Sequence, residues 1–199
     1  MSIPGRALAI GLALALLAGC ASAPPRLPQD WDVHREAMAA IDHWGLDGKL
    51  GYRSPDDSGS ATLTWAQQGD SFQATLSGPF GAGSAQIEAG PQGALLRQPG
   101  TPEQRAASTE ELSEQLFGWA LPATRLRDWA RGIPFHGTPV QRLDVDATGL
   151  LHGLDQDGWT LTFGDYRETA AGLLPGRIDA DRRGLHIRLV IKQWHFPAP

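Results

Sequence analysis

Residues 61–77 read ATLTWAQQGDSFQATLS, and this stretch decides the fold class. On both sides of a central Gly-Asp turn, every second residue is apolar: Leu63 and Trp65 before it, Phe72 and Leu76 after it. A period of two is typical of strands with one buried face, and a short polar turn between two such runs predicts an antiparallel hairpin. We therefore expect an antiparallel sheet with one apolar face.

The same alternation recurs on both sides of this hairpin, so the predicted sheet has many strands. Each further run is bounded by Gly, Pro, Asp or Ser, and the runs centre on Leu50 and Tyr52, on Ile87, on Leu95, on Trp159 to Phe163 and on Ile187 to Ile191. Asp157-Gly158, just before Trp159, has the composition of a tight hairpin turn. The chain is predicted to be mainly β, within the α+β class.

A stretch with helical spacing precedes the strands. Its apolar residues recur every three or four positions from Trp31 to Trp44. Asp30 is the predicted N-cap of this helix, and Gly45 is the predicted stop.

A second helical region, between residues 108 and 131, interrupts the strands. Ser108 and Glu111 form a capping box, which predicts a helix start. Leu126 and Trp129 mark the apolar face of a further helix. We expect all these helices to cover the apolar face of the sheet.

Composition excludes several classes of protein. The 199 residues carry a net charge of −5, which argues against nucleic acid as a partner. A single cysteine cannot form an internal disulfide or a four-cysteine zinc site. The six histidines are not at metal-ligand spacing, and the sequence contains no nucleophile-elbow, phosphate-loop or zinc-protease motif. We expect no metal, no resident cofactor and no enzymatic activity.

The first twenty residues, MSIPGRALAIGLALALLAGC, have the pattern of an export signal. Arg6 precedes an apolar run from Ala7 to Ala18, which falls short of the roughly 20 residues of a permanent membrane-spanning helix. The run ends in Leu17-Ala18-Gly19-Cys20, which resembles the lipobox of bacterial lipoproteins. The alternative is an ordinary secretory signal whose cysteine is accidental.

The lipobox implies how the chain is divided. Residues 1–19 would be removed as a lipoprotein signal peptide, and Cys20 would carry an S-diacylglycerol and an N-acyl group. Residues 20–30, with their several prolines, would form a short tether. Residues 31–199 would then form a single domain.

One loop has a composition that is unusual for a simple turn. In SGPFGAG, at residues 77–83, the segment Gly78-Pro79-Phe80-Gly81 places a bulky ring among turn-forming residues. Phe80 either turns inward and joins the core, or projects outward. A projecting ring would gain about 1.5–3 kcal/mol on burial in a lipid surface or a partner.

In their order along the chain, these features resemble the LolB family of outer-membrane receptors in bacterial lipoprotein sorting. The resemblance covers essentially the whole mature chain. It rests on the lipobox at Cys20, Gly48-Lys49-Leu50, the Gly78-Pro79-Phe80-Gly81 loop, Leu126-Arg127-Asp128-Trp129 and the closing Gln193-Trp194. It implies an incomplete antiparallel β-barrel, or half-barrel, with helices covering its hydrophobic concave face.

The resemblance also implies a function. Family members are outer-membrane lipoproteins that face the periplasm, receive acylated lipoproteins from a soluble LolA-like carrier and insert them into the inner leaflet of the outer membrane. They use a hydrophobic residue on a protruding loop for insertion, and Phe80 matches it. The residue after Cys20 is Ala21 and not the Asp that resembles an inner-membrane retention signal. By this resemblance the mature protein goes to the outer membrane. We expect a monomer, with outer-membrane lipid as a further partner.

Such a function needs an apolar cavity, and inward-facing apolar residues are the candidates for its lining. They are Leu50, Tyr52, Leu63, Trp65, Phe72, Leu76, Ile87, Trp119, Trp129, Trp159, Phe163, Leu189 and Ile191. Ordinary core packing is the competing interpretation for each of them. The alternative function is therefore a structural or assembly lipoprotein of the outer membrane, whose solid-core domain binds another envelope protein. An envelope hydrolase is a third class, without a nucleophile–base motif to support it.

Overall fold

The computed structural model describes residues 30–78 and 83–197, so the predictions for Cys20, Pro79, Phe80 and Gly81 lie outside the described residues. The strands are β1 (His43–Arg53), β2 (Ser58–Gln68), β3 (Ser71–Ser77), β4 (Ser84–Gly90), β5 (Gly93–Arg97), β6 (Gln104–Ala106), β7 (Val140–Val145), β8 (Leu151–Gln156), β9 (Trp159–Gly164), β10 (Arg167–Thr169), β11 (Gly172–Leu174), β12 (Arg177–Arg182) and β13 (Leu185–His195). The helices are α1 (Trp31–Ala39), α2 (Thr109–Phe117) and α3 (Ala123–Ala130).

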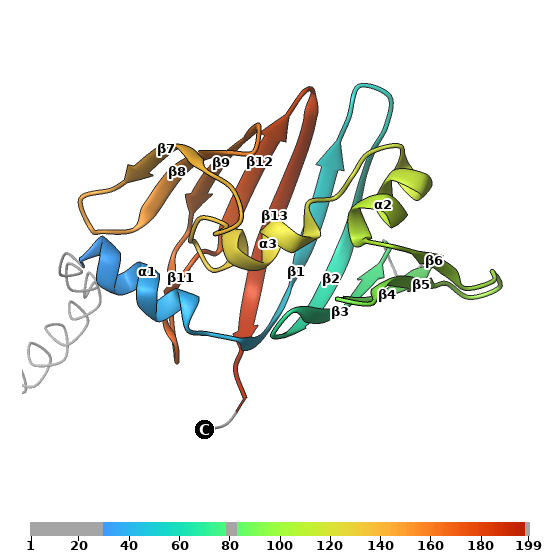
Figure 1. Ribbon diagram of the computed structural model, residues 1–199, viewed down its shortest axis with the longest axis horizontal. Helices are drawn as coiled ribbons and strands as arrows, with labels where there is room; N and C mark the ends of the chain where they lie inside the picture. The colour runs from blue at the N-terminus through green and yellow to red at the C-terminus, as the bar shows by residue number, and fades with distance from the viewer. Residues whose placement is uncertain (1–29, 79–82, 198–199) are drawn as a thin grey trace, which may run out of the picture.

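An antiparallel sheet of eleven strands forms most of the described part of the chain. Its order is β6-β5-β4-β3-β2-β1-β13-β12-β9-β8-β7, and β10 and β11 form a separate hairpin. The sheet is curved and does not close, and α2 and α3 lie across its concave face (Figure 1). This open, helix-covered arrangement confirms the predicted half-barrel.

The two edges of the sheet, within the described residues, are β6 and β7. β6 has three residues. β7 pairs with β8 in a register that shifts twice, between Val140 and Arg142 and between Asp144 and Val145. Both edges are therefore short or irregular, and neither offers a long regular row of backbone groups for pairing.

The two predicted hairpins form. β2 and β3 pair with Trp65 opposite Ala74 and Leu63 opposite Leu76. In the turn between β8 and β9, Asp157 has φ of 53° and Gly158 has φ of 74°. Two successive residues in the left-handed region are characteristic of the type I′ hairpin turn, which has the twist that antiparallel strands need.

The core lies between the concave face of the sheet and the helices, and aromatic rings fill much of it. Trp65 of β2 stacks on Trp44 of β1, with ring centroids 6.0 Å apart, and on Phe72 of β3, at 4.5 Å. Under α3, Trp129 meets Trp159 of β9 edge to face at 6.2 Å. Such pairs contribute packing energy beyond their buried area and fix the positions of the rings.

The N-terminal helix is shorter than predicted. It starts as expected, because Asp30 accepts hydrogen bonds from the backbone N–H groups of Asp32 and Val33. It ends at Ala39, however, and Trp44 belongs to β1, where it pairs with Gln67 of β2. The prediction was wrong at this end because the spacing of Trp44 fits a helix as well as a strand.

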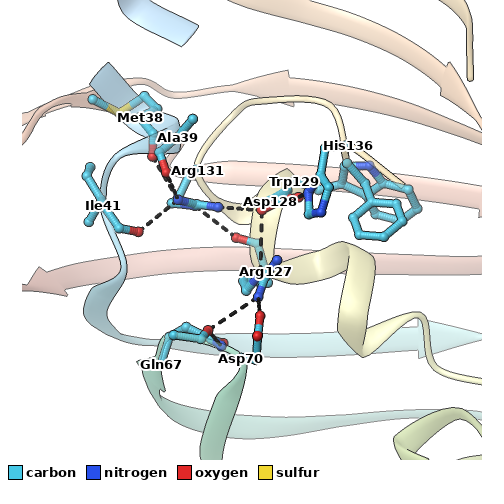
Figure 2. A network of polar contacts seen from close by, with 12 residues as sticks. Met38, Ala39, Ile41, Gln67, Asp70, Arg127, Asp128, Trp129, Arg131 and His136 are labelled. Atoms are coloured by element: carbon cyan, nitrogen blue, oxygen red, sulfur yellow. Dashed lines mark hydrogen bonds and ion pairs between the residues drawn. The ribbon is translucent and has the colours of Figure 1, made fainter. Parts of the chain in front are cut away.

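A buried arginine joins α3 to the end of α1 (Figure 2). Nη1 of Arg131 donates hydrogen bonds to the carbonyl oxygens of Met38 and Ile41, each at 2.8 Å, and of Ala39 at 3.3 Å. Its Nη2 donates to Oδ1 of Asp128, one turn earlier in α3. The last carbonyl groups of a helix lack hydrogen-bond donors within the helix, and Arg131 donates to those of Met38 and Ala39. Burial lowers the pKa of Arg131, and the charge of Asp128 opposes this effect.

Two side chains of α3 fasten it to the sheet. Nη1 of Arg127 donates to Oδ1 of Asp70, at 2.5 Å, and to the carbonyl oxygen of Gly69, at 3.3 Å, in the turn between β2 and β3 (Figure 2). Nε1 of Trp129, which is fully buried, donates to Oε1 of Gln156 in β8 at 2.9 Å. The helix is thus held to α1, to the β2–β3 turn and to β8.

Asp128→Ala should lower the free energy of unfolding by about 3–5 kcal/mol, because it leaves Arg131 buried without its carboxylate. Urea unfolding of the Cys20→Ala chain measures the effect. Asp32→Ala is the control, because Asp32 pairs with Arg35 in water at the surface and should matter far less. An equal loss of unfolding free energy in the two variants would show that the buried pair stabilises the fold no more than the surface pair does.

Candidate functional site

An apolar cavity of about 580 Å³ lies between α2 and the concave side of β1 to β4. From the sheet it is lined by Leu50, Tyr52, Gly59, Ser60, Ala61, Leu76, Ser84, Ala85 and Ile87. The loop between β5 and β6 contributes Gln98, Pro99 and Thr101, and α2 with the loop after it contributes Thr109, Leu112, Ser113, Trp119 and Leu121. Gly78 and Gly83 complete the lining. Pockets of this size and character take small or chain-like apolar ligands.

Small side chains on the sheet create this space. Gly59 and Ala61 of β2 and Ala85 of β4 bring the backbone wall close to the cavity, where larger residues would fill it. At Gly59 a Cβ atom would approach a ring carbon of Tyr52 to 2.7 Å, so glycine is needed for that ring to lie across β2. The cavity is therefore a consequence of residue size at a few positions.

Tyr52 and Trp119 face each other across one side of the cavity, with ring centroids 5.5 Å apart. The hydroxyl of Tyr52 donates to Oδ2 of Asp57 at 2.5 Å. This hydrogen bond to a carboxylate raises the pKa of Tyr52, because it stabilises the neutral phenol. The ring stays uncharged, as an apolar lining requires.

The loop that contains Phe80 starts and ends at the cavity. Gly78 and Gly83 both line it, and the backbone N–H of Gly78 donates to the carbonyl oxygen of Gly83 at 3.2 Å. Gly83 has φ of 73°, a conformation that glycine adopts without strain. The described residues on both sides of this loop therefore border the cavity.

The structure separates the predicted lining residues into two groups. Leu50, Tyr52, Leu76, Ile87 and Trp119 border the cavity. The others lie in the packed core or, for Phe72, half-buried beside it: Leu63, Trp65, Phe72, Trp129, Trp159, Phe163, Leu189 and Ile191. For this second group, contact with a ligand stays a prediction that would require a larger cavity than this one.

Sequence reasoning did not select several residues that shape the cavity. Leu112 and Leu121 come from α2 and the loop after it, and Gly59, Ala61 and Ala85 make room by being small. Leu112 carried a sequence signal, since it follows Ser108 on the apolar face of the predicted helix, and Ala61 and Ala85 fall on the apolar side of the alternating runs. Small residues carry a weak hydrophobic signal, and their role depends on what packs opposite them.

A second pocket, of about 820 Å³, lies at the other end of the concave face. Arg127 and Asp128 of α3 and its C-cap Arg131 line it together with Trp31 and His136. Its walls are mixed, polar and apolar, and its charges are largely paired with one another. This pocket has the character of a charged junction between elements, unlike the apolar cavity.

No group of three or more His, Cys, Asp and Glu residues in the described part of the chain is arranged to hold a metal ion. Among the helices described there, none combines the length and apolar character needed to cross a membrane.

Comparison with known sequences gives a consistent set of relatives. The family model described as "Outer membrane lipoprotein LolB" matches residues 42–194. The outer-membrane lipoprotein LolB of Cellvibrio japonicus is 42% identical over 190 residues, covering 93% of this chain and 94% of that protein. The protein of the same name from Pseudomonas putida strain W619 is 38% identical over 188 residues, covering 91% of each.

Comparison with solved structures supports the fold. A LolA superfamily protein of Nitrosomonas europaea superposes with a TM-score of 0.57 at 11% identity, covering 86% of this chain and 95% of that one. A DUF1329 family protein of Desulfovibrio piger gives a TM-score of 0.53 at 10% identity, covering 83% and 91%. At such low identity the likeness concerns the fold alone.

Ala85→Trp should fill the apolar cavity and weaken the binding of a fluorescent long-chain fatty acid at least tenfold, about 1.4 kcal/mol. The measurement is a fluorescence titration of the Cys20→Ala chain. Gln86→Trp is the matched control, because Gln86 is the next residue of β4 and its side chain is exposed on the other face. Unchanged binding in Ala85→Trp would exclude the cavity as the binding site.

Proposed function

This chain belongs to the LolB family of outer-membrane lipoproteins, and we propose that it accepts the acyl chains of lipoproteins in its apolar cavity and inserts these lipoproteins into the inner leaflet of the outer membrane. The observation that carries the proposal is the cavity between α2 and the small residues of β2 and β4. Its lining is uncharged and mostly apolar, as the burial of hydrocarbon requires.

Energetics explain why a cavity is needed. A triacylated lipoprotein carries some forty methylenes, and each gains about 0.8 kcal/mol on leaving water. Free passage through the periplasm is therefore prohibitive, while transfer between apolar sites is not. Burial in a cavity is non-directional, so one site serves many cargo proteins and no covalent step is needed.

The loop at residues 78–83 is proposed to carry out insertion. Its ends border the cavity, so an acyl chain that leaves the cavity would pass close to the loop. Phe80 would enter the lipid, where burial of its ring contributes about 1.5–3 kcal/mol. The loop would thus bring the cavity into contact with the membrane surface.

The anchor of the protein is proposed to be Cys20, modified with S-diacylglycerol and an N-acyl group. More than one acyl chain gives a stable attachment, whereas a single chain holds marginally. The tether of residues 20–30 leads directly into α1, whose N-cap is Asp30. The domain would therefore stay close to the outer membrane on its periplasmic side.

The proposed donor of cargo is a soluble periplasmic carrier of the LolA type. The fold likeness to a LolA superfamily protein is compatible with a donor and an acceptor of similar architecture. The protein is proposed to act as a monomer, with the apolar cavity beside α2 free for cargo.

A specific observation favours the alternative of a solid-core binding domain: most of the concave face is packed with buried side chains. Transfer of a purified acylated lipoprotein from its carrier to the Cys20→Ala chain separates the two functions. Saturable transfer supports the receptor. Its absence, in a folded protein, supports the alternative.

Phe80→Glu should leave cargo uptake intact and reduce insertion into liposomes at least tenfold, because a charge at the loop tip resists entry into lipid. Uptake is measured by co-purification with cargo, and insertion by flotation of cargo with the liposomes. Phe80→Leu, which keeps an apolar side chain, should insert normally. Normal insertion by Phe80→Glu would rule out this role of the loop.

A further inference from the structure

We propose that a groove on the convex face of the sheet binds the phosphate of a phospholipid headgroup and thereby fixes which end of the domain faces the membrane. The groove has a volume of about 640 Å³ and lies across β2, β1 and β13. Its functional groups come from Gly51, Arg53, Ser58, Ser60, His186 and Arg188. The inference rests on the proposed function, which brings the domain to a membrane surface, and it adds a site for the lipid itself.

The register of the strands brings these residues together on the convex face. Tyr52 lines the apolar cavity on the concave face, so its neighbours Gly51 and Arg53 in β1 face the other way. The residues of the groove form two rows across three paired strands: Arg188, Gly51 and Ser60 in one row, and His186, Arg53 and Ser58 in the next. The groove is therefore built on regular sheet, where side chains have defined directions.

Gly51 lies in the middle of the groove, and packing within the fold does not require a glycine there. Its φ is not among the positive ones, and a Cβ atom would meet no described residue beyond its chain neighbours closer than 3.8 Å. At Gly48 in the same strand, by contrast, a Cβ would approach the carbonyl oxygen of Val190 to 2.4 Å. A glycine inside a strand weakens it and often marks a place where a ligand approaches the backbone.

Positive charge is in surplus beside this space. The guanidinium of Arg53 is exposed and has no hydrogen-bond or ion-pair partner among the described residues. Nε of Arg188 donates to Oδ1 of Asp179, while its two terminal nitrogens donate to no other described residue. Asp179 also lies 3.6 Å from Nε of Arg177. One carboxylate thus faces two guanidinium groups, and Arg53 is left without one.

The acidic side chains nearby are turned to other partners. Asp181 is paired with the imidazole of His186, with Oδ1 2.9 Å from Nδ1. Asp57, in the turn between β1 and β2, accepts a hydrogen bond from a ring hydroxyl on the concave side. Among the described residues, the lining of the groove contains no Asp or Glu. The groups that line it are mostly hydrogen-bond donors, so the groove favours an anion.

A phosphate group matches this set of donors. Arg53 and Arg188 can each present two parallel N–H groups to phosphate oxygens. The hydroxyls of Ser58 and Ser60 add further donors, and the space at Gly51 lets an oxygen approach the sheet. The groove is shallow and open along the surface, so it can reach a phosphate that is itself displayed on a surface. A phospholipid headgroup displays its phosphate in this way.

The groove lies at the end of the sheet that the proposed function turns toward the membrane. The β1–β2 and β12–β13 turns lie side by side at this end (Figure 1). β3 ends there as well, since Ser77 pairs with Thr62 of β2. Tyr52 and Gly59 line both the groove and the apolar cavity, so one thickness of sheet separates the two sites. A headgroup held in the groove would keep the cavity beside the lipid surface.

The charge of the whole chain makes a local cationic site effective in orienting the domain. A net charge of −5 repels the domain from an anionic membrane surface. Attraction is then confined to the side with surplus cations, because charges act over a screening length of about 8 Å at physiological salt. The proposed anchor would hold the domain near the membrane, and the groove would decide how it is turned.

Flotation of the Cys20→Ala chain with lipid vesicles tests the proposal without any cargo. We expect binding to phosphatidylcholine vesicles that contain phosphatidylglycerol. Arg53→Gln should lower this binding about fivefold, since a cation near an anionic lipid surface contributes about 1 kcal/mol. Gly51→Val should lower it to a similar extent without any change of charge, because the new side chain fills the middle of the groove.

Lys192→Gln is the matched control. It removes the same charge as Arg53→Gln from an exposed position in the later half of β13, outside the groove, and should leave vesicle binding almost unchanged. Equal weakening in these two variants would indicate general charge attraction and overturn the proposal, as would full binding by Arg53→Gln and by folded Gly51→Val. Binding of inorganic phosphate without binding of vesicles would assign the groove to a free anion and overturn its membrane role.

Failure of this inference and failure of the proposed function give different results. Arg53→Gln should leave the binding of a fluorescent fatty acid unchanged, because Arg53 does not line the apolar cavity. If lipoprotein transfer occurs but vesicle binding ignores Arg53 and Gly51, the function stands and the phosphate groove is wrong. If vesicle binding depends on both residues but no lipoprotein is accepted, the groove stands as a lipid site and the proposed function fails.

Discussion

The guanidinium of Arg131 is the interaction on which the rest of the structure depends. Burying a charge costs several kcal/mol unless its partners are well placed, and here they are the carboxylate of Asp128 and three carbonyl oxygens at the end of α1. The contact links the start of the domain to a helix some ninety positions later in the chain. It fixes α3 over the middle of the concave face and so decides where the face is filled and where it stays open.

The two ends of the concave face differ because of this placement. At one end, charged side chains from α3 meet α1 and the β2–β3 turn and are satisfied by one another. At the other end, α2 covers small residues of β2 and β4 with mostly apolar contacts, and a cavity remains. Polar networks fix geometry closely, while apolar surfaces accept varied partners. The polar contacts that hold the fold together and the apolar cavity that can accept a ligand therefore lie at different ends of the same sheet.

Much of the fold could be predicted from the sequence, because the relevant signals are local. The alternation around Leu63 and Trp65, the Asp157-Gly158 turn and the N-cap at Ser108 each depend on a few neighbouring residues, and the structure confirms them. The Glu111 side chain accepts from the backbone N–H of Ala107, one residue before the position that a capping box predicts. The end of α1 was predicted wrongly, because the position of Trp44 fits the spacing of apolar residues in a helix as well as the alternation in a strand.

The site was harder to predict, because it depends on distant residues. Asp128 entered the sequence argument only as part of a short motif, and its buried pairing with Arg131 depends on where α1 ends. Gly59 and Ala85 form a cavity only because α2 lies opposite them without filling the space. Cys20 and Phe80 lie outside the described residues, so their roles stay predictions.

The irregular edges of the sheet affect how copies of a membrane-anchored protein can contact one another. Proteins anchored to a surface are confined to two dimensions, where their local concentration is high and collisions are frequent. An open sheet with long regular edges would then join edge to edge with its neighbours and aggregate. The shifted register of β7 and the three residues of β6 leave little to join. The half-barrel can therefore stay open while offering little regular edge to a neighbouring copy.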